Sequence, residues 1–139
     1  MKTKVLLVED SRLLRITSER ALVKAGYEVM WAADGEQALR AVHDRMPDLI
    51  LLDMILPKMT GLNVLRSLKQ DPVTTHIPVI VLSGLSQRNE QKLVEAGAAA
   101  YWQKSESILD NDSAGLVLAV ETVLNKWKRI PGTKVKGAP

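Results

Sequence analysis

The chain has 139 residues with no cysteine and no phenylalanine, a length that suits one domain with an aliphatic core and a composition that excludes disulfides and thiolate sites. Its formal net charge of +3 comes from residues 126–139, which carry five basic side chains and no acid, so that residues 1–125 have a net charge of −2. A basic face for nucleic acid is therefore not expected, and the tail is interpreted as a solvated segment.

The first half of the chain alternates between strand and helix patterns. A strand is expected over residues 4–8, where the apolar run is too short for a signal peptide or a membrane span. A helix is expected over residues 11–25. The alternating residues 27–31 indicate an edge strand, and a second helix is expected over residues 34–44 with Asp34 as its N-cap.

The most informative stretch is the next one. Residues 49–52 are four consecutive aliphatic residues, which is the pattern of a strand buried on both faces at the centre of a sheet. Asp53 follows at the carboxyl end of that strand, where open parallel sheets present their ligand-binding groups. Pro57 and Gly61 then break the chain, and a third helix is expected over residues 60–70.

The second half continues the alternation. We expect a strand over residues 77–82, a helix over residues 86–96, a strand over residues 99–103 and a helix over residues 112–127. Five such alternations predict an α/β fold, with a single doubly wound five-stranded parallel sheet flanked by five helices. Because no internal repeat or second core is present, one domain is predicted.

Polar side chains follow four of the five expected strands. They are Glu9 and Asp10 after the first strand, Asp53 after the third, Ser83 after the fourth and Lys104 after the fifth. Three carboxylates at one edge repel one another and need a cation, and oxygen ligands favour Mg²⁺ or Mn²⁺ over Zn²⁺. Aspartate is a nucleophile toward phosphoryl groups, whose oxygens a metal, a lysine and a hydroxyl can stabilise.

In the order and spacing of these residues, residues 3–126 resemble the receiver domain of bacterial two-component response regulators, the CheY-like family. The resemblance implies a flavodoxin-like sheet of strand order 2-1-3-4-5 and identifies Asp53 as the phospho-acceptor. It also implies a magnesium site in which Asp10 and Asp53 bind directly, Glu9 binds through water, and the backbone carbonyl of Ile55 is a further ligand.

By the same resemblance, Ser83 moves toward the phosphoryl group, Tyr101 swings inward with it, and Lys104 pairs with the phosphate. The family usually has proline after this lysine, often with a cis peptide bond, and this chain has Ser105. Because a non-proline cis bond costs roughly 3–4 kcal/mol, we expect a trans peptide and a looser loop here. We expect this difference to affect the orientation of the Lys104 side chain.

Two further positions tune dephosphorylation in the family, and here they are Ile55 and Leu85. Neither aliphatic side chain can orient an attacking water. The sequence therefore predicts a long-lived acyl phosphate on Asp53.

The functional hypothesis is a switch, not an enzyme beyond its own phosphorylation and dephosphorylation. A sensor histidine kinase or a histidine phosphotransfer protein supplies the phosphoryl group, and contacts with a downstream protein change at the face of the fourth helix, fifth strand and fifth helix. By the resemblance, Leu13 and Leu14 are candidates for kinase docking; ordinary core packing is the alternative, and for Leu14 the two are compatible. We expect a cytoplasmic protein, either a monomer or a phosphorylation-dependent dimer, without direct contact to nucleic acid or membrane. Residues 1–127 form the receiver domain, and residues 128–139 are a basic tail or the start of a linker.

Two alternatives remain at this point. One is a Mg²⁺-dependent phosphatase acting through an aspartyl-phosphate, but haloacid-dehalogenase-like enzymes have a second aspartate where this chain has Ile55, and they need a cap. The other is a pseudo-receiver scaffold that is not phosphorylated, against which the intact acidic cluster argues.

Two tryptophans and both histidines are not assigned a part in the function. Trp31 and Trp102 are interpreted as packing residues, with Trp102 and Tyr101 on opposite faces of their strand. His43 and His76 are expected to be solvated and without a role.

Overall fold

The computed structural model describes residues 2–83, 90–103 and 112–128, with side chains at all of these positions except 83, 90, 103, 112, 113 and 128. The strands are β1 (Lys4–Val8), β2 (Glu28–Ala32), β3 (Leu49–Asp53), β4 (Val79–Ser83) and β5 (Ala100–Gln103). The helices are α1 (Arg12–Lys24), α2 (Gly35–Arg45), α3 (Gly61–Gln70), α4 (Glu90–Glu95) and α5 (Asp112–Lys128).

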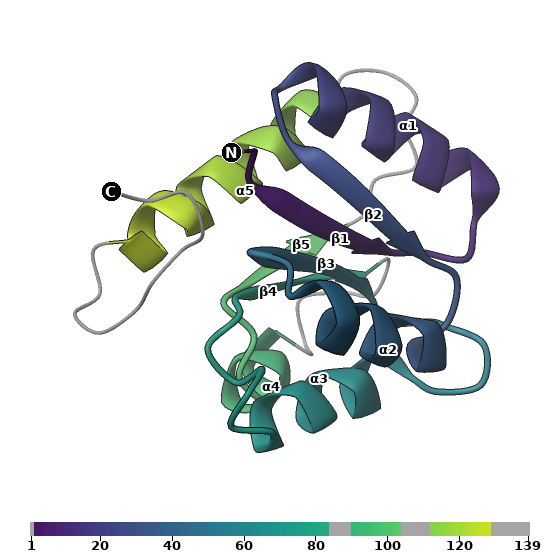
Figure 1. Ribbon diagram of the computed structural model, residues 1–139, viewed down its shortest axis with the longest axis vertical. Helices are drawn as coiled ribbons and strands as arrows, with labels where there is room; N and C mark the ends of the chain where they lie inside the picture. The colour runs from purple at the N-terminus through teal and green to yellow at the C-terminus, as the bar shows by residue number, and fades with distance from the viewer. Residues whose placement is uncertain (1, 84–89, 104–111, 129–139) are drawn as a thin grey trace.

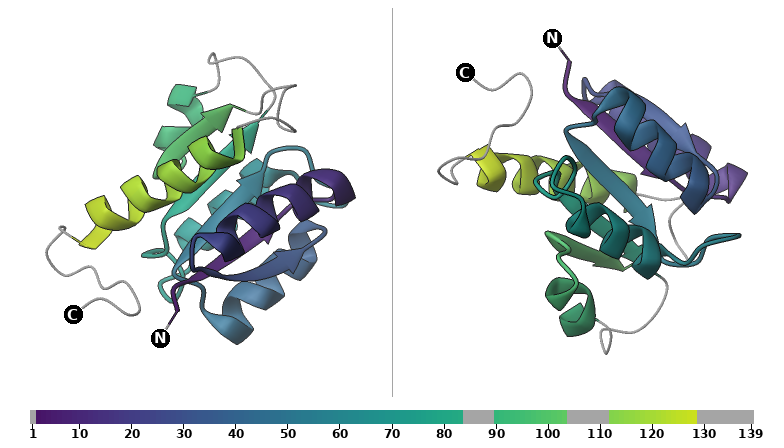
Figure 2. Two further views of the ribbon diagram at one scale, coloured as in Figure 1. Left: turned by 90° about the horizontal axis from the view of Figure 1, so that it is seen from above. Right: turned by 60° about the horizontal axis from the view of Figure 1, so that its bottom comes forward.

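The five strands form one sheet of order β2-β1-β3-β4-β5, and every neighbouring pair is parallel. Helices α1 and α5 cover one face of the sheet, and α2, α3 and α4 cover the other (Figures 1 and 2). The predicted α/β fold class, the strand order 2-1-3-4-5 and the edge position of β2 are confirmed. All the strands therefore end at the same edge of the sheet.

Side chains cap three of the helices where the sequence places polar residues. The Ser11 hydroxyl accepts a hydrogen bond from the amide of Leu14 (3.4 Å), and the Asp34 carboxylate accepts one from the amide of Gln37 (2.8 Å). Thr60 caps α3 in the same way through the Asn63 amide, at 3.2 Å. These caps satisfy amides that have no partner inside the helix, and so they fix where each helix begins.

Most predicted element ends agree with the structure to within one residue, and β4 is the exception. The sequence predicts a strand over residues 77–82, but β4 begins two residues later, at Val79. Pro78 has no amide proton for the ladder, although its carbonyl accepts from the Ile50 amide at 3.0 Å. For the predicted helix over residues 86–96, the described part is Glu90–Glu95, and residues 86–89 lie outside the described residues.

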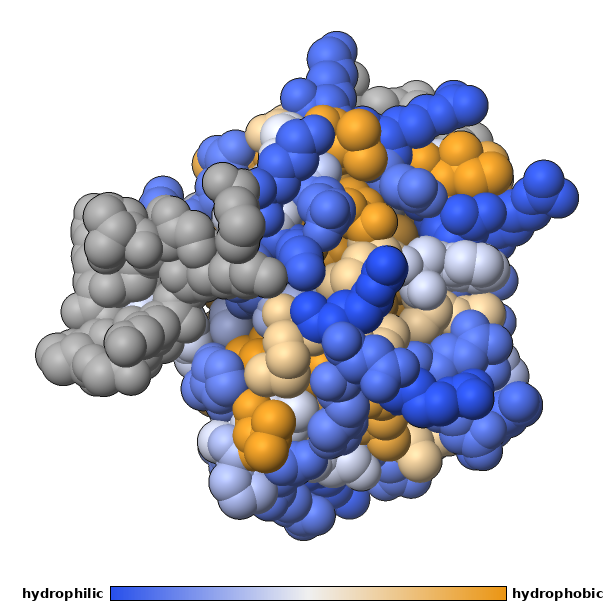
Figure 3. Space-filling view, viewed as in Figure 1, coloured by the Kyte–Doolittle hydropathy of each residue, from blue (hydrophilic) through white to orange (hydrophobic). Residues whose placement is uncertain are grey.

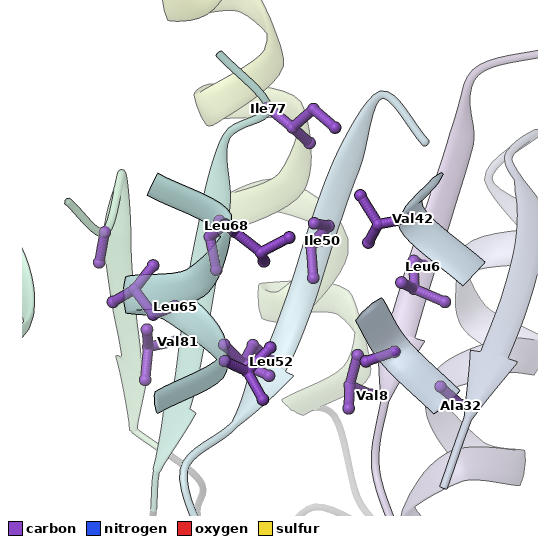
Figure 4. Close-up of a cluster of buried hydrophobic side chains, with 14 of the residues drawn as sticks. Leu6, Val8, Ala32, Val42, Ile50, Leu52, Leu65, Leu68, Ile77 and Val81 are labelled. Atoms are coloured by element: carbon purple, nitrogen blue, oxygen red, sulfur yellow. The ribbon is translucent and has the colours of Figure 1, made fainter. Parts of the chain in front are cut away.

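The core consists of two hydrophobic clusters, one on each face of the sheet. The first cluster joins Leu6, Val8, Ile50 and Leu52 of the strands to residues of α2, α3 and α4 (Figure 4). The second cluster joins the alternate strand residues, Val5, Leu7, Leu49 and Leu51 among them, to α1 and α5. Successive strand residues point to opposite faces, so a sheet covered on both sides requires the unbroken aliphatic runs seen in the sequence.

The aromatic pair on β5 follows the same alternation. Tyr101 packs against the first cluster and Trp102 against the second, so the two rings lie on opposite faces as predicted. Trp102 is a packing residue, as the sequence suggested.

The outer surface in Figure 3 is mainly hydrophilic with scattered hydrophobic side chains. Within the described ranges, no helix is both long enough and apolar enough to cross a membrane.

The two histidines differ in their surroundings. The His76 side chain is exposed, as expected, and its backbone carbonyl accepts a hydrogen bond of 2.8 Å from the indole Nε1 of Trp127. The expectation that His43 is solvated is confirmed, but the sequence did not predict the contacts that its ring makes. Its ring is exposed, but Nδ1 lies 2.8 Å from the carbonyl oxygen of Leu39 and Nε2 lies 2.8 Å from Oδ2 of Asp71. This contact joins the last turn of α2 to the residue that ends α3.

Candidate functional site

Three acidic side chains meet at the carboxyl edge of the sheet. Glu9, Asp10 and Asp53 each bring one carboxylate oxygen to a point where all three oxygens lie within 4.8 Å of one another. They converge because β1 and β3 are adjacent and parallel, with Val8 paired to Leu52, so the residues that follow each strand emerge side by side. The predicted gathering of this acidic group is therefore confirmed.

Two of the three carboxylates are buried, and the third is exposed. Glu9 is 2% exposed and Asp53 is 5% exposed, whereas Asp10 faces solvent. Neighbouring negative charges repel, and burial removes the water that would stabilise them. A donor set made only of oxygens, with one open side at Asp10, fits a hard divalent cation such as Mg²⁺ or Mn²⁺.

The Asp53 side chain is oriented by the backbone that follows it. The amide of Ile55 donates to Asp53 Oδ1 at 3.2 Å. The amide of Met54 continues the ladder to the carbonyl of Leu82 at 3.0 Å, and the Gly61 amide closes the loop on the carbonyl of Met54 at 2.9 Å. The backbone next to Asp53 is therefore fixed by hydrogen bonds to β4 and to the first residue of α3.

The loop between β3 and α3 also rests on the start of α2. The Lys58 ammonium lies 3.6 Å from Oδ2 of Asp34 and 3.8 Å from Oε2 of Glu36. The pKa of Asp34 lies below its usual range, first because the Gln37 amide donates to this carboxylate and also because Lys58 is near. Ile55, in the same loop, is 68% exposed and close to Asp53.

The segment between β1 and α1 is held by a residue whose contacts the sequence does not reveal. The Trp31 indole Nε1 donates to the carbonyl oxygen of Glu9 at 2.8 Å, and Arg15 lies over the indole ring at 4.1 Å from its centroid. Trp31 is 45% exposed, so its interpretation as a packing residue alone is wrong. The sequence offered one signal, the alternation of side chains along the strand. Trp31 lies on the same strand face as Val29, which packs against the second cluster beneath α1.

The remaining predicted residues are placed only in part. Ser83 ends β4, one residue beyond the Leu82 that pairs with Asp53, and its side chain is outside the described structure. Tyr101 is half-buried on β5. Lys104, Ser105 and Leu85 lie outside the described residues. On α1, Leu13 is 57% exposed and Leu14 is half-buried, so both the docking and the packing interpretations fit this pair.

Comparison with known sequences points to one family. The family model for the response regulator receiver domain matches residues 5–110. The gliding motility regulatory protein of Myxococcus xanthus is 46% identical over 107 residues, which are 76% of this chain but only 14% of that protein. The polar-differentiation response regulator DivK of Brucella anthropi is 34% identical over 109 residues, or 78% of this chain and 89% of that protein.

Solved structures agree with the sequence relatives. The chemotaxis response regulator CheY4 of Vibrio cholerae matches with a TM-score of 0.80 at 28% identity, covering 88% of this chain and 99% of that one. The Mn²⁺-bound form of response regulator Rcp1 matches with a TM-score of 0.75 at 29% identity, covering 86% of this chain and 92% of that one. The similarity to these two structures thus covers most of the chain and its fold.

Proposed function

Because this chain belongs to the response regulator receiver domain family, we propose that it accepts a phosphoryl group on Asp53 and switches its protein contacts in response. Receiver domains are signalling modules of two-component systems, and histidine kinases or phosphotransfer proteins phosphorylate them. The observation that carries the proposal is the convergence of Glu9, Asp10 and Asp53 at the carboxyl edge of the sheet.

The acidic group would hold Mg²⁺, or Mn²⁺ in its place. Asp10 and Asp53 are the proposed direct ligands, Glu9 the ligand through water, and the carbonyl of Ile55 a further ligand. A cation bound there offsets the charge of the carboxylates and of the phosphoryl oxygens. The close approach of three carboxylate oxygens, two of them on buried residues, supports this assignment.

The phosphoryl step follows from the position of Asp53. A carboxylate oxygen of Asp53 attacks the phosphorus of a phosphohistidine on the partner protein, and the new O–P bond forms as the N–P bond breaks. The partner's imidazole, protonated on its other nitrogen, leaves as neutral histidine. The Ile55 amide, 3.2 Å from Oδ1, keeps the carboxylate in one orientation for the attack. Lys104 and Ser83 are the proposed contacts for the transferred oxygens.

Phosphorylation then changes the positions of two side chains near the site. Ser83 moves toward the phosphoryl group and Tyr101 follows into the space it leaves. This shifts an existing equilibrium at the face of α4, β5 and α5, where a downstream protein binds. We propose residues 1–127 as the receiver domain, with residues 128–139 as a basic tail or the start of a linker. The domain works in the cytoplasm as a monomer or as a dimer formed on phosphorylation, and it catalyses only its own phosphorylation and dephosphorylation.

The whole protein's activity and partners remain part of the proposal. The chain spans 14% of the gliding motility regulatory protein and 23% of response regulator PleD of Caulobacter vibrioides, so those proteins contain much that this chain does not align with. The phosphatase and scaffold alternatives are not favoured, since the matching family is a signalling module.

The test is chemical labelling. Incubation with acetyl phosphate and Mg²⁺ should add one phosphoryl group to the wild-type chain, detected by intact mass, and a chelator should prevent it. Asp53→Asn should remain unlabelled. Glu28→Gln, which removes an exposed carboxylate on β2 away from the acidic group, should be labelled like the wild type. Labelling of Asp53→Asn at the wild-type level would refute the assignment.

A further inference from the structure

The backbone of Glu9 is fixed at both of its polar groups. Its amide donates to the carbonyl of Ala32 at 3.0 Å, one step beyond the last residue of β1. Its carbonyl oxygen accepts the 2.8 Å hydrogen bond from Nε1 of Trp31. The first contact extends the β1–β2 ladder, whereas the second comes from a side chain and depends on the presence of an indole.

Fixing this carbonyl also constrains Asp10. The peptide unit that joins Glu9 to Asp10 is planar, so the direction of the Glu9 carbonyl sets the direction in which the chain enters Asp10. Both carboxylates of the acidic pair are attached to this one unit, and Ser11 begins the capped α1 directly after it. The Trp31 hydrogen bond therefore acts on the relative positions of two of the three carboxylates that face the cation.

Arg15 holds the indole in this orientation. Its guanidinium carbon lies 4.1 Å from the centre of the Trp31 ring, and its Nη1 bonds to Oε2 of Glu19 at 3.1 Å. The Nε of Arg15 is buried and has no hydrogen-bond acceptor among the residues that the structure describes, so the ring supplies its electrostatic partner. A stacked cation on one side and a carbonyl at the edge leave the indole little freedom.

We propose that Trp31, supported by Arg15, is a positioning residue that holds Glu9 and Asp10 in the geometry needed to bind the divalent cation. This inference rests on the proposed function, because it needs the cation site. Burial does not account for Trp31, which is 45% exposed on the edge strand. The role follows from the indole N–H, a donor that a phenylalanine ring lacks.

The experiment measures Mg²⁺ affinity on the full, unphosphorylated chain by titration calorimetry. Trp31→Phe should weaken binding about 3- to 10-fold, the worth of one hydrogen bond. Trp127→Phe is the matched control, because it removes an indole-to-carbonyl hydrogen bond of the same 2.8 Å length, made to His76. That control should bind Mg²⁺ like the wild type. Arg15→Met, which keeps the aliphatic stem, should weaken binding by a smaller factor, and thermal unfolding verifies that each variant is folded.

The outcomes separate this inference from the proposed function. Wild-type Mg²⁺ affinity in Trp31→Phe would overturn the positioning role, whatever Arg15→Met shows. Equal weakening in Trp31→Phe and Trp127→Phe would overturn it as well, because a general loss of rigidity would then be the cause. Asp10→Asn is the reference: if it loses Mg²⁺ affinity while Trp31→Phe keeps it, only this inference fails. If Asp10→Asn binds like the wild type, the cation site itself fails.

Discussion

Gly61 lies against the backbone carbonyl of Asp53 so closely that a side chain at position 61 has no room. A β-carbon there would overlap the Asp53 carbonyl oxygen and lie 2.7 Å from the Cα of Met54. The first residue of α3 and the last residue of β3 are thus in direct backbone contact. The spacing of Asp53 and Gly61 in the sequence reflects this steric requirement.

Gly61→Ala should therefore damage both stability and labelling. Pushing the two backbones apart should lower the free energy of unfolding by about 1–3 kcal/mol and slow phosphorylation by acetyl phosphate, because Asp53 moves with its backbone. Urea unfolding and intact mass measure the two effects. Gly26→Ala is the control, since φ is 101° there and nothing lies within 4 Å of the added carbon. It should lose stability through backbone strain but be labelled at the wild-type rate. Unchanged stability and labelling in Gly61→Ala would contradict the steric argument.

Ile55 should set the lifetime of the phosphoryl group. Its side chain is 68% exposed and its amide contacts Asp53, so a polar group at this position could hold a water near the phosphorus. The wild-type acyl phosphate should persist well beyond seconds, and Ile55→Gln should shorten its lifetime, as measured by loss of label after the donor is removed. Ile55→Leu should behave like the wild type. Loss of the wild-type label within seconds would show the prediction to be wrong.

The contact between His43 and Asp71 should make stability depend on pH. Leu39 and Asp71 both present acceptors to the ring, so both ring nitrogens must donate and the charged imidazolium is favoured. The Leu39 carbonyl and then Asp71 raise the pKa of His43 above 6.5, and His43 in turn lowers the pKa of Asp71 below 3.8. The stabilisation from His43 is complete below pH 6.5 and is lost as the pH rises through its folded pKa. That from Asp71 is present above pH 3.8 and is lost as the pH falls through its folded value.

Melting temperatures between pH 4 and pH 9 can test this window. The wild type should lose stability as the pH rises above 6.5, and His43→Gln should lose less over the same interval. The chain has only two histidines, so His76→Gln, at an exposed position, is the natural control and should keep the wild-type profile. If His43→Gln follows the wild-type curve throughout, the imidazolium assignment is wrong.

Lys69 should stabilise the turn before β4. Its ammonium donates to the carbonyls of Thr75 (3.0 Å) and Ile77 (2.8 Å), and burial lowers its pKa to about 8. Lys69→Met keeps the aliphatic stem but leaves both carbonyls without this donor, which should lower the free energy of unfolding by about 1–3 kcal/mol. Urea unfolding at neutral pH measures the loss. Lys126→Met, at an exposed position on α5, should change stability little, and an equal loss in both variants would count against the proposed bonds.

The fold and the acidic edge could be predicted because both depend on patterns local to the chain. Aliphatic runs such as residues 49–52 identify buried parallel strands, and parallel strands must end together, which brings Asp53 to Glu9 and Asp10. The start of β4 was placed two residues early, because a pattern of hydrophobicity does not register that Pro78 lacks an amide proton.

The contacts that the sequence did not reveal are side-chain hydrogen bonds between distant segments. Trp31 reaches Glu9 across 22 positions and His43 reaches Asp71 across 28. Each bond depends on strand register, on helix packing and on one rotamer, and hydrophobic periodicity does not encode these. For Trp31 the one signal was strand parity, which put the indole on the same face as Val29 but did not identify its acceptor.

The hydrogen bond from Trp127 to His76 fixes the last turn of α5 beside the amino end of β4, far from Asp53. Five strand residues separate the two ends of β4, about 16 Å, and the 17 residues of α5 span about 25 Å. A change at Asp53 therefore does not contact the last turn of α5 directly. It can reach that turn through a rigid-body tilt or slide of the helix, in which the end of α5 farther from the site moves more than the nearer end.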